Sequence, residues 1–176
     1  MTGLARMLDR IAGLLGTVSA AVAAVILAAV TCHILLEILL RNLFNSSTHA
    51  VDELVGYGVG AMTILAMAHT LRRGEMIRVH ILLARLSNTP RRAVEVVVAL
   101  LTLIPVMLIG RAFVLSAARS WREGSVSTGL LEVPLWIPEA IFAFGLLLLA
   151  FQLVTYIACL ILDASAPIFV SDVTTE

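Results

Sequence analysis

The chain has 176 residues, of which 60% are hydrophobic and only 14% charged, and its formal net charge at pH 7 is zero. A soluble domain carries about 25% charged residues, and one small core cannot hide this much apolar surface, so the composition excludes an ordinary soluble globular protein. We expect no nucleic-acid partner.

Four apolar segments are long enough to cross a bilayer, which takes about 20 consecutive apolar residues in a helix. They cover residues 13–40, 51–71, 92–118 and 134–162. We therefore predict an all-α integral membrane protein, in which residues 1–176 form a single domain of four transmembrane helices. The first apolar run is longer than the roughly 7–15 residues of a signal-peptide core, so we expect an uncleaved first helix.

Arginine placement predicts the orientation of these helices. The segment between the second and third helices holds one acid and six arginines: Arg72, Arg73, Arg78, Arg85, Arg91 and Arg92. Two more arginines, Arg6 and Arg10, lie in the N-terminal region. Basic residues are retained on the cytoplasmic side of a membrane. We expect both termini inside, the segments 41–50 and 119–133 outside, and a location in the bacterial cytoplasmic membrane.

The inner segment between the second and third spans has a helical pattern of its own. Its apolar residues recur at steps of three and four: Met76, Val79, Leu83 and Leu86. Arg78 and Arg85 fall elsewhere on the helical wheel. This pattern predicts a short amphipathic helix lying on the inner leaflet, between helices two and three.

Charged residues inside or beside the spans share one depth near the predicted outer side. Glu37 and Arg41 have the spacing of an ion pair on one helical face, and Asp52 and Glu53 open the second helix. The sequence predicts that Glu37 and Arg41 pair with Asp52 or Glu53.

Two further charges complete this layer. Arg111 in the third span is expected to pair with Glu139 in the fourth. The pairs could pin helices together or line an ion or substrate path. Pinning is favoured, because Pro105 is the only proline in the middle of a span and a path usually needs matched broken helices.

Other motifs carry little chemistry. Gly56 and Gly60 form a GxxxG in the second span, which predicts close helix packing within the chain or against another subunit. Cys32 and Cys159 are far apart, so we expect neither a zinc site nor a thiol–disulfide centre. We expect no cofactor, no metal and no enzymatic activity. A haem held by two of the four scattered histidines stays a minor alternative.

Several short motifs, in order, resemble the small integral-membrane subunit (the DctQ-like component) of TRAP transporters, the tripartite ATP-independent periplasmic family. They are Arg41-Asn-Leu-Phe-Asn-Ser-Ser, Asp52-Glu53-Leu54, Leu71-Arg72-Arg73-Gly74, Ile77-Arg78-Val79 and the run from Gly129 to Pro138 that contains Pro134, Trp136 and Pro138. The resemblance covers residues 37 to about 155. The chain departs from the family at Met76, where histidine is usual, and at His80, where aspartate is frequent.

The resemblance implies a role as an accessory scaffold rather than a reaction. In this family the small subunit braces a large multi-spanning membrane subunit, which holds the substrate and sodium sites. A periplasmic binding protein delivers the solute, often a carboxylate, and an ion gradient drives uptake. Arg73, Gly74, Arg78, Pro134, Trp136 and Pro138 are then the expected motif residues for contacts with partners or membrane lipids. The alternative is a self-sufficient, homo-oligomeric small exporter or channel.

Overall fold

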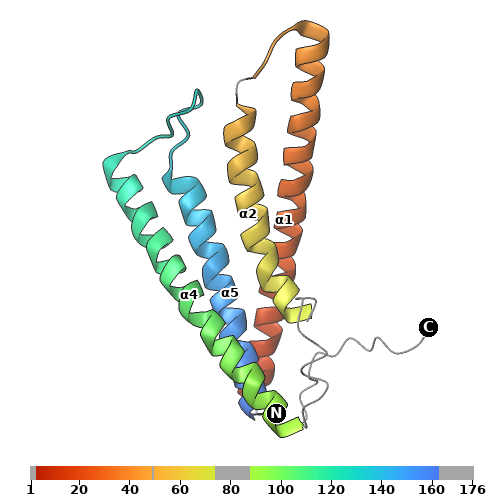
Figure 1. Ribbon diagram of the computed structural model, residues 1–176, viewed down its shortest axis with the longest axis vertical. Helices are drawn as coiled ribbons and strands as arrows, with labels where there is room; N and C mark the ends of the chain where they lie inside the picture. The colour runs from red at the N-terminus through yellow and green to blue at the C-terminus, as the bar shows by residue number, and fades with distance from the viewer. Residues whose placement is uncertain (1–2, 49, 74–87, 163–176) are drawn as a thin grey trace, which may run out of the picture.

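The computed structural model describes residues 3–48, 50–73 and 88–162, and within these ranges it is all-helical (Figure 1). The helices are α1 (Gly3–Phe44), α2 (Val51–Arg73), α4 (Asn88–Glu123) and α5 (Trp136–Leu162). All four are long and apolar enough to cross a membrane, which confirms the predicted fold class. The predicted interfacial helix lies within residues 74–87, outside the described residues, and the orientation stays a prediction.

Two antiparallel hairpins make up the bundle, α1 with α2 and α4 with α5. Helix α5 joins them, since it contacts α2 and α1 as well as α4. Figure 1 shows the hairpins converging where α1 begins and diverging toward the opposite end. We call the first the N-terminal end and the second, which carries residues 45–50 and 124–135, the loop end.

The helices extend beyond the apolar spans. Helix α1 has 42 residues, which at about 1.5 Å per residue is roughly twice the 30 Å hydrocarbon thickness of a bilayer. Its candidate membrane span, Arg10–Phe44, contains an 18-residue stretch with a mean hydropathy of 2.4. Large apolar side chains on α1 and α4 are exposed, for example Val25 at 69% and Leu108 at 63%. Such surfaces are stable only in lipid or against a partner.

The core lies toward the N-terminal end and is centred on α5. It contains Leu71 of α2, Ala99 and Val106 of α4, and four residues of α5. Those four are Leu146, Leu149, Ala150 and Leu153. Nearer the loop end, Phe113 and Phe142 pack edge to face at 5.4 Å between ring centroids. The buried apolar cluster is therefore concentrated toward the N-terminal end.

The helix ends at the loop end follow from particular residues. Helix α4 stops at Gly124, whose φ of +62° suits glycine, and the Ser125 amide donates to the Ser120 carbonyl at 3.1 Å. These are the features of a Schellman cap. Pro138 lies in the first turn of α5, where its missing N–H leaves no helical hydrogen bond unmade. The chain between them pairs Val126 with Pro134 in an isolated bridge.

Candidate functional site at the loop end

Glu37 is the centre of a polar cluster at the end of α1. Its side chain is 5% exposed, although that of Arg41, its ion-pair partner at 2.8 Å, is 63% exposed. The carboxylate also accepts hydrogen bonds from the Ser47 hydroxyl, from the Thr48 amide at 3.0 Å and from the Thr48 hydroxyl at 2.6 Å. Glu37 thus holds Ser47 and Thr48, in the connection that leads to α2, against the end of α1.

This arrangement limits what Glu37 can do chemically. A carboxylate has about four lone-pair sites, and four hydrogen bonds are made to Glu37, two on each oxygen. No acceptor position is left for a passing cation or a substrate proton. The cluster formed by Glu37, Arg41, Ser47 and Thr48 therefore acts as a clasp on the turn between α1 and α2.

The two acids that open α2 have different surroundings. Asp52 is exposed, whereas Glu53 is partly buried and has an oxygen, Oε1, with no hydrogen-bond partner among the described residues. The Glu53 carboxylate lies against the backbone of Gly129, where an added Cβ would collide with it. Glycine at position 129 thus allows the loop between α4 and α5 to approach the start of α2.

The structure does not bring Arg111 and Glu139 together as an ion pair. Arg111 is exposed and no ion pair joins it to Glu139 within the described ranges; instead Glu139 accepts a hydrogen bond from the Ser116 hydroxyl at 2.7 Å. The neighbouring Gly110 faces α5, 3.6 Å from the Leu146 Cβ when a Cβ is added. One residue is about 100° of rotation on a helix, so the next side chain turns away from α5.

Trp136, in the run from Gly129 to Pro138, joins the ends of α4 and α5. Trp136, the first residue of α5, packs edge to face on Trp121 with ring centroids 4.7 Å apart. Pro134 is exposed and Pro138 is buried. Trp121 is 64% exposed, and amphipathic rings of this kind favour the membrane–water interface.

Of the glycines in α2, Gly58 and Gly60 make the close contacts. A Cβ at Gly58 would collide with Val30 of α1, and one at Gly60 would lie 2.8 Å from the Phe142 Cζ of α5. Nothing lies within 4 Å of a Cβ at Gly56. Gly60, the second glycine of the GxxxG motif, therefore packs against α5 within the chain. Gly56, the first glycine, has free space beside it among the described residues.

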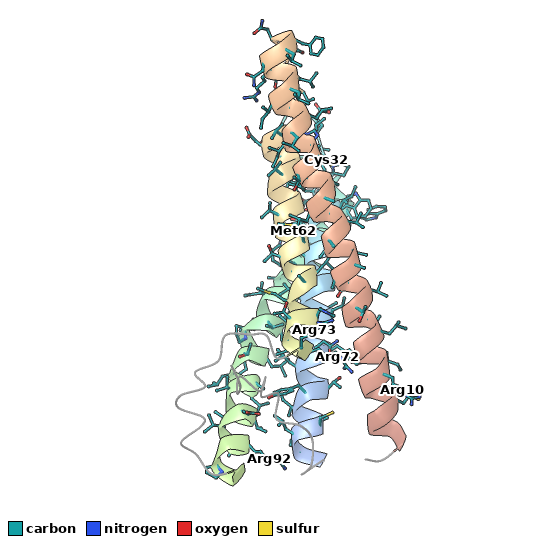
Figure 2. The ribbon with its side chains drawn as sticks, turned by 90° about the vertical axis from the view of Figure 1, so that its right-hand side faces the viewer. Arg10, Cys32, Met62, Arg72, Arg73 and Arg92 are labelled. Atoms are coloured by element: carbon teal, nitrogen blue, oxygen red, sulfur yellow. The ribbon has the colours of Figure 1, made fainter. Side chains whose placement is uncertain are left out.

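Arginines gather at the N-terminal end. Figure 2 shows Arg10 on α1, Arg72 and Arg73 at the end of α2, and Arg92 near the start of α4, all at this end of the bundle. Arg72 covers Gly13 of α1, since a Cβ there would lie 3.0 Å from the guanidinium carbon. The short motif that contains Arg73 also includes Gly74, and the next one includes Arg78; both residues lie outside the described residues.

The sequence reasoning missed polar contacts between helices near the N-terminal end. Gln152 of α5 is buried and donates to the Ala12 carbonyl of α1, and the Tyr156 hydroxyl donates to buried Glu95 of α4 at 2.9 Å. A polar residue within an apolar run was the available signal for both Gln152 and Glu95. Among the described residues, no group of three or more His, Cys, Asp or Glu side chains could hold a metal ion.

A hollow of about 490 Å³ lies between α1, α2 and the start of α5. Its lining is apolar except for His33 and Tyr57, and it includes Pro138. The Nε2 atom of His33 is buried and has no hydrogen-bond partner in the described part of the chain. An apolar hollow of this kind does not form a continuous polar path through the bundle.

Comparison with protein-family models gives a match over residues 30–163 to the family described as "Tripartite ATP-independent periplasmic transporters, DctQ component". Comparison with curated proteins and with solved structures gives no match. The family match spans α2, α4, α5 and about the last third of α1, and so includes the clasp, the Trp121–Trp136 contact and the lining of the hollow except Ile26 and Ala29. The chain belongs to the DctQ family, the small membrane component of tripartite ATP-independent periplasmic transporters.

Proposed function

We propose that this chain is the accessory scaffold subunit of a secondary transporter in the bacterial cytoplasmic membrane. Its partners are a large multi-spanning subunit, which carries the solute and the coupling ion, and a periplasmic binding protein that delivers the solute. The solute class that fits the family is an organic acid, and an ion gradient drives its uptake. The chain itself performs no reaction.

The observation that carries this proposal is the use of the polar groups within the helices. Glu37 is saturated by the clasp, Glu139 accepts from Ser116, and Glu95 accepts from Tyr156. Each of these contacts joins two segments of the bundle. Intramembrane charges that bind the protein's own groups serve stability, whereas a transport path needs them to face water. The exposed apolar surfaces of α1 and α4 offer the area that a larger subunit and lipid would cover.

The arginines support an orientation with the N-terminal end in the cytoplasm. Arg10, Arg72, Arg73 and Arg92 all lie at that end. The clasp and the segment 124–135 then face the periplasm, where a binding protein arrives. Anionic headgroups of the inner leaflet are suitable partners for the arginines.

Reconstitution tests the proposal. The chain, a large multi-spanning subunit of a TRAP transporter and a periplasmic binding protein are combined in liposomes under an imposed ion gradient, and uptake of candidate organic acids is measured. Uptake is expected only when all three are present, together with co-purification of the two membrane chains in mild detergent. Uptake by liposomes that hold this chain alone would instead establish a self-sufficient transporter.

Thiol labelling tests the orientation independently. With Cys32 and Cys159 replaced by alanine, a single cysteine is introduced at Val126 or at Arg10. An impermeant maleimide applied to spheroplasts should label position 126 and not position 10 until the cells are opened. The opposite pattern would reverse the orientation.

A further inference from the structure

Arg111 lies in the middle of the exposed, apolar face of α4. Helix α4 packs on α5 at one edge of the bundle (Figure 1), and buried Val106 and Gly110 mark the side that meets α5. On the other side, Leu108 and Leu115 lie one turn before and after Arg111 and are 63% and 54% exposed. Arg111 is exposed as well. A positive charge therefore interrupts a row of large apolar side chains.

This charge lies deep within the candidate span of α4, Arg92–Glu123. The charged end of the helix begins at Arg119, and the exposed ring of Trp121 follows. At about 1.5 Å per residue, Arg111 lies roughly 12 Å from Arg119 and roughly 15 Å from Trp121 along the helix. Half of the hydrocarbon core is about 15 Å thick. Arg111 therefore lies within the hydrocarbon, whichever end of the bundle faces the cytoplasm.

The direction of α4 works against escape of this charge to water. On a helix the Cα–Cβ bond tilts toward the helix N-terminus, and α4 begins at the N-terminal end of the bundle (Figure 1). The nearer membrane surface for Arg111 is at the loop end, in the opposite direction. To snorkel there, the side chain would have to turn back along its own helix. An unpaired charge in hydrocarbon is costly, so Arg111 calls for a partner at its own depth.

Neither the described part of the chain nor a second copy offers that partner. Arg111 makes no hydrogen bond or ion pair with any other described residue. The acids that the structure shows as exposed, Asp52, Glu123 and Glu132, lie at the loop end. A second copy would enter the membrane in the same orientation, so its own Arg111 would lie at that depth and repel the first.

We propose that the exposed face of α4 packs against a spanning helix of the large subunit, and that a carboxylate on that helix pairs with Arg111. This inference rests on the proposed function, which supplies the large subunit. Charged residues in spans almost always face the interior of a helix bundle, so the bundle that encloses Arg111 has to include another chain. A carboxylate can accept two parallel hydrogen bonds from the guanidinium. The exposed surface of α1 carries no charge between Arg10 and Glu37, and lipid is sufficient to cover it.

Binding in mild detergent tests this proposal, with the full chain and the large subunit that supports uptake in the reconstitution described above. Arg111→Leu leaves the carboxylate of the partner without a counter-ion, and Arg111→Glu places a like charge beside it. Loss of one member of a buried pair predicts a weakening of about 30-fold or more for Arg111→Glu. Arg119→Leu is the matched control, because it removes an exposed arginine at the charged end of the same helix. It should bind the large subunit like the wild type.

Three further measurements separate this contact from folding. The isolated Arg111→Leu chain should be at least as stable in micelles as the wild type, because it loses a charge that has no partner among the described residues. A photoreactive residue at position 108 or 115 should crosslink to the large subunit. Replacing the aspartates and glutamates in the spans of the large subunit by arginine, one at a time, should yield one variant that restores binding to Arg111→Glu.

Equal affinity of Arg111→Glu and Arg119→Leu for the large subunit would overturn the proposal and leave the scaffold role standing. Crosslinks from positions 108 and 115 to phospholipid alone would do the same, since Arg111 would then reach lipid phosphate by snorkelling. Crosslinks to a second copy of this chain would also overturn it. A wild-type chain that binds no large subunit would instead refute the proposed function, and this inference with it.

Discussion

Gly60→Ala measures how closely α2 and α5 approach each other. The added methyl carbon would lie 2.8 Å from the Cζ and 3.0 Å from the Cε1 atom of Phe142. This ring cannot swing away freely, because it packs edge to face on Phe113 at 5.4 Å. Overpacking of this kind costs about 1–3 kcal/mol, while alanine recovers up to about 1 kcal/mol of helix propensity. The net expectation is a loss of up to about 2 kcal/mol in the free energy of unfolding.

Gly56→Ala is the matched control, since it lies one turn away on the same helix with nothing within 4 Å of the new carbon. It carries the propensity gain without the collision. The difference between the two variants should therefore be about 1–3 kcal/mol. Unfolding by sodium dodecyl sulfate in mixed micelles, followed by circular dichroism, gives both values. Equal stability of the two variants would refute the packing derived for Gly60, as would a failure of Phe142→Leu to relieve the effect.

Three further predictions concern the polar groups. Gln152→Leu removes a hydrogen bond to the α1 backbone and should lower the free energy of unfolding by about 0.6–1.7 kcal/mol in the same micelle assay; an unchanged value would contradict that contact. In a double-mutant cycle of Arg111→Leu and Glu139→Leu, the coupling energy should stay below about 0.5 kcal/mol, and a larger coupling would restore the ion pair that the structure lacks. Glu37→Gln should speed hydrogen exchange at the Thr48 amide, because a neutral amide oxygen is a weaker acceptor than a carboxylate, and unchanged exchange would mean that the clasp does not restrain the turn.

The four helices could be predicted from the sequence because each depends on a local property. A continuous apolar run forms a spanning helix whatever surrounds it, since hydrocarbon cannot satisfy an open backbone. Asp52 and Glu53, at the start of the second run, indicated a helix N-terminus, and α2 begins at Val51. The spacing of Glu37 and Arg41 likewise brings the two side chains within 2.8 Å of each other.

Contacts between helices could not be predicted in the same way. Two residues at one depth, such as Arg111 and Glu139, meet only if both helices are also rotated correctly about their axes. The apolar run around Arg111 is nearly uniform, so its sequence carries little information about rotation. Gly110 marks the face of α4 that meets α5, but one glycine among many apolar residues is a weak signal. The same ambiguity concealed that Gly58 contacts α1.

The partners of Glu37 were hidden for a different reason. Ser47 and Thr48 lie in a short connection with no periodic pattern, so their hydroxyl groups could be placed only after the chain had turned at Asn45, which has a φ of +48°. Asparagine tolerates this left-handed conformation better than most residues. The turn residue was visible in the sequence, but the direction of the following segment was not.

The positions of the contacts between the two hairpins connect the fold to the proposed role. At the N-terminal end, the apolar core and the hydrogen bond from Gln152 to the Ala12 carbonyl join the two hairpins directly. At the loop end, the clasp at Glu37 acts within the α1–α2 hairpin, an apolar hollow lies between that hairpin and the start of α5, and the hairpins meet where Glu53 lies against Gly129. The apolar side chains that α1 and α4 expose are not covered by the packing of the described residues. A large subunit and lipid on these two helices would cover them, as the proposed scaffold role requires.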